Sequence, residues 1–131
     1  MAPRQASILR ITDLALQIEG PTGWVEPLMW RWQGWMGNQA GAPWTLALTV
    51  GAPTSSRVPL YLARPDFGAG TCHLVAPGFS GTIEPDRRVA HLAAHPQASL
   101  GDLSVFVRTC VAVEAFARGG LLFHAAGVVR H

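Results

Sequence analysis

Two histidines, His91 and His95, have the spacing that most resembles a metal-binding pattern. On a helix, imidazoles four residues apart can share one zinc ion. The surrounding segment favours a strand, however, in which residues i and i+4 lie roughly 13 Å apart. Cys72 and His73 add a potential soft ligand pair, but neighbours in a strand point to opposite faces. We therefore expect no metal site, and a small metal-dependent enzyme using His91, His95 and Cys72 is our third hypothesis.

The nucleophiles of the sequence do not stand in catalytic patterns. All 10 basic residues are arginine, which excludes a Schiff-base lysine, a Ser-Lys dyad and a P-loop lysine from these residues. Ser80 follows Phe79 and precedes Gly81 without forming a GxSxG motif, so it is typical of a turn. Cys110 falls in an apolar helical pattern, where a thiol is inert packing. We expect no catalytic residue in this chain.

Five tryptophans provide a candidate binding surface. Trp24, Trp30 and Trp35 form a candidate surface for a peptide or protein partner, because large aromatic side chains anchor many interfaces. The alternative is a core anchor, since Trp32 and Trp35 follow the helical spacing of buried residues. Burial of Trp30 and Trp35 would favour the core.

Composition restricts the class of protein. The chain has 131 residues, is 49% hydrophobic and carries a net charge of +2, which predicts a single domain over residues 1–131. No uninterrupted apolar run reaches 18 residues, so we expect no membrane span. The small charge and scattered arginines predict no nucleic-acid partner. Two cysteines without a disulfide framework, and no secretory signal, indicate the cytoplasm.

The periodicities predict an α+β fold with a mostly antiparallel sheet. Strand patterns occupy residues 7–20 (a strand or hairpin edge), 43–50, 58–63, 71–76, 79–84, 87–93 and 121–130, and residues 63–70 are expected to form a loop. The turn dipeptides Pro77-Gly78 and Pro85-Asp86 join the three strands between residues 71 and 93. This spacing predicts an antiparallel meander.

Two helices are expected beside the sheet. The main helix covers residues 99–118, where Ser99 and Asp102 resemble a capping box and Gly119-Gly120 ends the helix. It should pack on one face of the sheet. A short Trp-rich helix is expected at about residues 27–36, with Pro27 in its first position. A strand with Trp30 and Trp32 on one face is the alternative there.

The stretch Arg118–Arg130, RGGLLFHAAGVVR, resembles the segment just before the phosphate-binding loop of HPr kinase-related proteins. These are P-loop kinases of the phosphoenolpyruvate-carboxykinase-like type. In the family a helix ends in Gly-Gly, a strand of the form LLHAAGVV follows, and GxxxxGK[ST] comes a few residues later. The resemblance is specific over about residues 103–130 and loose before them. His124 matches the family histidine and, by this resemblance, would lie near the nucleotide site.

The loop's glycines, lysine and Ser/Thr do not occur in this sequence. The resemblance therefore implies a non-catalytic N-terminal portion of a longer protein that phosphorylates a protein or peptide. ATP and Mg²⁺ are implied only for a full-length relative, and no cofactor is expected here. The alternative is a stand-alone peptide- or protein-binding module using the Trp surface. A homo-oligomer through an exposed sheet edge is also expected, because the 121–130 strand would lack sheet partners.

Overall fold

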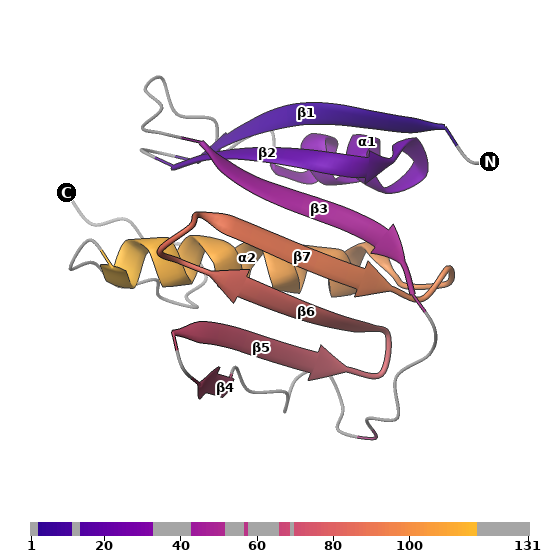
Figure 1. Ribbon diagram of the computed structural model, residues 1–131. Coiled ribbons are helices and arrows are strands. Elements are labelled where there is room, and N and C mark those ends of the chain that lie inside the picture. The colour runs from indigo at the N-terminus through magenta and orange to yellow at the C-terminus, as the bar shows by residue number, and fades with distance from the viewer. Residues whose placement is uncertain are drawn as a thin grey trace, which may run out of the picture.

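The computed structural model describes residues 3–11, 14–32, 43–51, 57, 66–68 and 70–117. Its strands are β1 (Arg4–Ile11), β2 (Leu14–Pro21), β3 (Trp44–Val50), β4 (Asp66–Gly68), β5 (Thr71–Ala76), β6 (Phe79–Glu84) and β7 (Val89–Ala94). Its helices are α1 (Thr22–Trp32) and α2 (Leu100–Ala117). The 7 strands of this part form one sheet in the order β1-β2-β3-β7-β6-β5-β4 (Figure 1).

Most strand pairings in this sheet are antiparallel, as the sequence predicts. The hairpin β1–β2 and the chain of β4, β5, β6 and β7 account for all the antiparallel pairs. Strand β3, which lies between β2 and β7, is instead parallel to both. Helix α1 stands between β2 and β3 in the chain, which is the connection that a parallel pair requires. The α+β prediction is confirmed, with a parallel centre that the turn signals did not predict.

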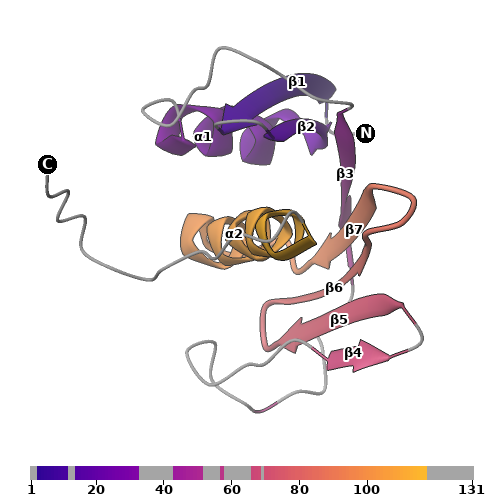
Figure 2. The same cartoon turned by 90° about the vertical axis from the view of Figure 1, so that its left-hand side faces the viewer.

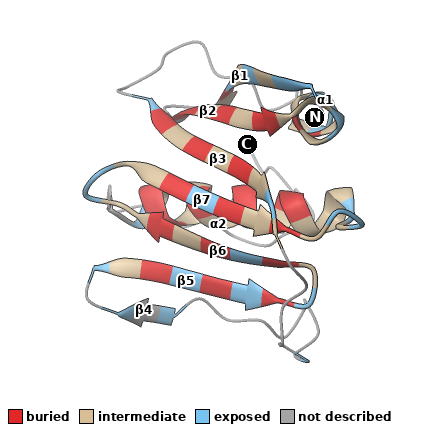
Figure 3. Ribbon diagram, turned by 45° about the vertical axis from the view of Figure 1, so that its right-hand side comes forward, coloured by how far each residue is buried: buried red, intermediate tan, exposed pale blue. Residues whose placement is uncertain are grey.

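Both helices pack on the same face of the sheet, as the edge-on view shows (Figure 2). Buried residues alternate with partly buried or exposed residues along β3, β5, β6 and β7 (Figure 3). The buried set faces the helices and includes Trp44, Phe79, Ile83, Leu92 and, from α2, Phe106. No described helix lies on the opposite face, which we call the open face.

Helix α1 begins earlier than the sequence predicts. It starts at Thr22, directly after β2, and Pro27 lies inside it rather than at its first position. A proline at this point leaves the carbonyl of Gly23 without its helical N–H partner. Gly23 is exposed, so water can take the place of that donor. The alternative of a strand with Trp30 and Trp32 on one face is wrong, and the expected helix beyond Trp32 lies outside the described residues.

Two further boundaries differ from the predictions. The segment 63–70, expected to be a loop, contains the short strand β4. Strand β7 begins at Val89 rather than at residue 87, because Arg87 and Arg88 donate backbone hydrogen bonds that close the β6–β7 turn. Arg88 completes this turn with a φ of 53°. The expected strands at 58–63 and 121–130 lie outside the described residues.

The start of α2 confirms the capping box. The backbone N–H of Ser99 donates to Oδ2 of Asp102 at 3.0 Å, and the N–H of Asp102 donates to Oγ of Ser99 at 3.1 Å. These reciprocal bonds satisfy two donors at the end of the helix. The helix then runs to Ala117, within a residue of the predicted end.

Candidate functional site

Strand register gathers polar side chains on the open face. Asp66 pairs with His73, His73 with Thr82, and Thr82 with His91. Directly paired residues point to the same side of a sheet, so the four form a line across β4, β5, β6 and β7. We call these four residues the polar row. His73 and His91 are exposed, so their imidazoles are accessible to a partner.

In the polar row, His91 contacts a residue outside the row. Its Nε2 lies 2.9 Å from Oγ1 of Thr49 on β3, and this contact holds the ring over the centre of the sheet. His73 lies two strands away, at a distance of about 10 Å from strand spacing. Both imidazoles lie on the open face. They can exchange hydrogen bonds with a partner's polar side chains.

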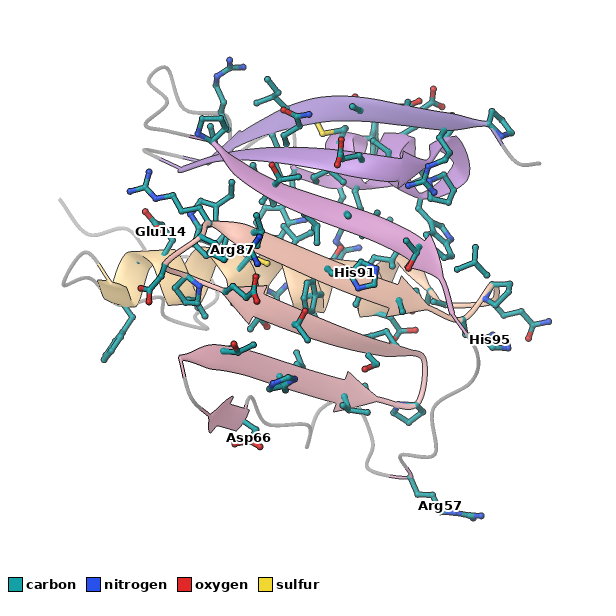
Figure 4. All side chains as sticks on the ribbon, in the orientation of Figure 1. Arg57, Asp66, Arg87, His91, His95 and Glu114 are labelled. Carbon is teal, nitrogen blue, oxygen red and sulfur yellow. The ribbon has the colours of Figure 1, made fainter. Side chains whose placement is uncertain are left out.

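The three residues of the metal hypothesis are not brought together. His91 is exposed on the open face, whereas Cys72 is buried on the helix side of β5. His95 follows the end of β7, and its Nδ1 accepts a bond from the backbone N–H of Gln97 at 3.1 Å. Figure 4 shows His91 and His95 well separated. Within the ranges the structure describes, no group of three or more His, Cys, Asp or Glu residues is placed to hold a metal.

Both cysteines are buried free thiols. Burial raises the pKa of the Cys110 thiol far above its ordinary value, and the nearby Cys72 adds to the rise. Burial also raises the pKa of Cys72, with a smaller contribution from the carboxylate of Asp66. A thiol that stays protonated is a poor nucleophile and a poor metal ligand. Their placement agrees with the expectation of packing at Cys110.

The candidate tryptophan surface is divided by the structure. Trp30 is 72% exposed on the outer side of α1. Trp24 is half-buried and packs against the hydrophobic core. Trp35 lies outside the described residues. Only Trp30 therefore remains as an observed surface residue of this set.

The structure also reveals a buried polar contact that the sequence analysis did not identify. The indole N–H of Trp44, at the start of β3, donates to Oε2 of Glu114 on α2 at 3.0 Å. Both side chains are buried, and Glu114 lies toward the end of α2 (Figure 4). The sequence signal for this contact was Glu114 itself, a carboxylate four residues after Cys110 on the apolar side of the helix. Buried carboxylates of this kind need a fixed donor, so this pair links α2 to the centre of the sheet.

Comparisons with family models, curated proteins and solved structures found no match to this chain. Over the described ranges, neither helix combines the length and the hydropathy that crossing a membrane requires. His124, which the resemblance places near a nucleotide site, lies outside the described residues.

Proposed function

We propose that this chain is the non-catalytic N-terminal portion of an HPr kinase-like protein, where it supports ATP-dependent phosphorylation of a protein or peptide. The observation that carries the proposal is the position of α2. This helix packs on the sheet and runs to Ala117. The Gly119-Gly120 pair and the stretch LLFHAAGVV follow directly in the sequence. The family has the same order of helix, Gly-Gly and strand.

The chemistry of the described residues supports recognition rather than catalysis. The buried polar residue Glu114 is engaged by Trp44, and the buried thiols are held in their protonated form by desolvation. On the open face, His73 and His91 of the polar row are exposed. An accessible sheet surface with hydrogen-bonding side chains is suited to a protein or peptide partner.

Two measurements test this proposal. Calorimetric titration of the 131-residue chain with MgATP should show no saturable binding in the micromolar range. The intact mass of the protein made in its source organism should exceed 14.0 kDa, and the longer form should transfer phosphate from ATP to a protein or peptide. Saturable micromolar ATP binding by these residues alone, or a native mass of 14.0 kDa, would overturn the proposal.

A stand-alone peptide- or protein-binding module is the second candidate, favoured by the exposure of Trp30. An indole 72% exposed to water is available to anchor a partner, because Trp is enriched at the centres of interfaces. Selection of displayed random peptides on the wild-type protein, with counter-selection on Trp30→Ala, tests this candidate. Peptides that require Trp30 would support the module, and their absence would remove it.

Self-association in the cytoplasm completes the proposal. Among the described strands, β1 and β4 are the two edges of the sheet, and unpaired edges can join strands of another chain. Sedimentation equilibrium at rising protein concentration should show a homo-oligomer. A strictly monomeric protein at the highest concentration would contradict this part.

A further inference from the structure

The backbone groups on the outer edge of β1 can be assigned from its pairing with β2. In an antiparallel pair, alternate residues direct their N–H and C=O toward the neighbour strand or away from it. The N–H of Thr22 donates to the carbonyl of Pro3 at 2.9 Å, which fixes the odd-numbered residues of β1 as the inward set. The even-numbered residues therefore direct their N–H and C=O outward: Arg4, Ala6, Ile8 and Arg10.

A second contact leads independently to the same assignment. Arg4 pairs with Pro21, and a proline has no N–H to offer either neighbour. The Nη2 of Arg4 donates to the carbonyl of Leu48 on β3 at 3.2 Å. The last β2–β3 pair is Glu19 with Ala47, and Leu48 follows it on β3. If the parallel ladder continued, the Leu48 carbonyl would accept a hydrogen bond from the backbone N–H of residue 21. The backbone nitrogen of Pro21 thus faces β3. The backbone N–H and C=O of its partner Arg4 therefore face away from β2.

Side chains at the outward positions determine which strand fits this edge. Strand β1 reads RQASILRI, with a positive charge near each end and no acidic residue. Between the arginines, Ile8 is 38% exposed and Ala6 is exposed. The guanidinium of Arg4 is engaged at the Leu48 carbonyl on β3, so Arg10 supplies the charge that an added strand would meet. A partner strand that is acidic opposite Arg10 and apolar opposite Ile8 and Ala6 therefore complements this edge.

A second copy of β1 does not complement it. A full-length antiparallel pair of two β1 strands places Arg4 of each copy opposite Arg10 of the other. Like charges placed directly opposite destabilise a strand pair, and a shifted register avoids them only by shortening the ladder.

We propose that the outer edge of β1 binds an extended segment of a partner protein, which adds to the sheet as an antiparallel strand and carries an acidic residue opposite Arg10, followed by an apolar centre. Backbone hydrogen bonds to the four outward residues supply the common affinity, and Arg10 selects the acidic strand. Self-association through a sheet edge, by contrast, is left to β4, the other edge of the described sheet. This inference goes beyond the proposed function and does not depend on a kinase relationship.

The probe is the labelled peptide ETVTVTE, which places glutamates opposite Arg10 and Arg4 and valines opposite Ile8 and Ala6. Its control is KTVTVTK, which differs only in the charge of its ends. Fluorescence anisotropy at low salt should give an affinity about tenfold higher for the acidic peptide. Added salt should narrow this ratio. Equal affinities, or no binding by either peptide at millimolar concentration, would overturn the proposal.

Two variants locate the binding on this edge. Ala6→Pro removes one outward N–H without removing a β1–β2 bond, and it should abolish peptide binding. Its matched control, Ala6→Val, keeps the N–H and should bind normally. Arg10→Glu keeps every backbone donor and should reverse the peptide preference, which covers the case that Ala6→Pro does not fold. An unreversed preference in Arg10→Glu would overturn the proposal.

Hydrogen exchange distinguishes the peptide from a second copy. In the free protein, the amides of Ala6, Ile8 and Arg10 should exchange quickly, while those of Ser7 and Leu9 are protected. Saturation with ETVTVTE should protect the first three amides selectively. Protection without peptide that rises with protein concentration, together with a dimer that Ala6→Pro dissociates, would identify a second copy as the occupant and overturn the proposal.

Discussion

Replacing Gly81 by alanine should destabilise the fold, because the added Cβ would force strand β6 and helix α2 apart. A Cβ at this position would lie 2.1 Å from Cε2 of Phe106, whereas carbon atoms in ordinary contact are about 3.5–4.0 Å apart. The ring would have to retreat by about 1.5 Å on these figures. Phe106 is fully buried and packs edge-on against Phe79, with ring centroids 6.0 Å apart, so it has little room to move.

The cost should lie at the upper end of the range for overpacking, about 3 kcal/mol. For a domain of this length, that loss lowers the melting temperature by about 10 °C. Urea unfolding and thermal unfolding of Gly81→Ala measure both quantities. Gly68→Ala is the matched control, because Gly68 also lies in a strand and an added Cβ meets nothing within 4 Å. It should change the free energy of unfolding by no more than about 0.5 kcal/mol.

A double mutant identifies the cause of the loss. Phe106→Leu removes the ring atoms that the new methyl group would strike, so it should cost less in the Gly81→Ala background than in the wild type. The coupling energy should be at least about 1 kcal/mol. Strict additivity of the two substitutions, or a loss in Gly81→Ala no larger than in Gly68→Ala, would refute the packing argument.

Three further predictions concern the buried contacts and the helix cap. Trp44→Phe leaves Glu114 without the indole donor and should cost about 1–3 kcal/mol in urea unfolding; Glu114→Gln, which keeps an acceptor, should cost less. Because burial raises the pKa of Cys72 and Cys110 in the native state, unfolding releases protons above about pH 8.5. The free energy of unfolding should therefore fall as pH rises beyond that value, and Cys110→Ala should reduce the slope. Ser99→Ala should lower stability by about 1 kcal/mol through loss of the cap on α2, measured by thermal unfolding.

Local sequence signals predicted those elements whose structure depends on local chemistry. The Ser99–Asp102 pattern specified the start of α2, because a capping box uses only groups three residues apart. The turn at Pro77-Gly78 and the alternation on either side of it specified the hairpin β5–β6. In both cases the hydrogen-bonding partners are near in sequence, so one stretch of residues contains the information.

Pairing between residues distant in sequence accounts for the main difference between the predicted and the observed fold. Nothing in the residues 44–50 shows that β3 lies parallel to both β2 and β7, since a strand's side-chain alternation is the same in either orientation. The sequence also does not predict the start of α1 at Thr22. Proline is favoured at the first helical position, so Pro27 predicts a start that is five residues too late. Inside the helix, the missing N–H of Pro27 leaves only the carbonyl of Gly23 without a donor. That carbonyl is exposed because of the tertiary structure, so the helix tolerates the proline.

The polar row shows how a surface can be encoded in turn lengths rather than in a motif. His73, Thr82 and His91 each occupy an exposed-side position of a different strand, and no two of them are close in sequence. The two-residue turn after Ala76 and the four-residue turn after Glu84 place them opposite one another. A shift of one residue in either turn would move the following strand's polar side chains to the buried face. The alternation of each strand is visible in the sequence. The two turn lengths set how the strands pair, and the pairing aligns the polar side chains in one row.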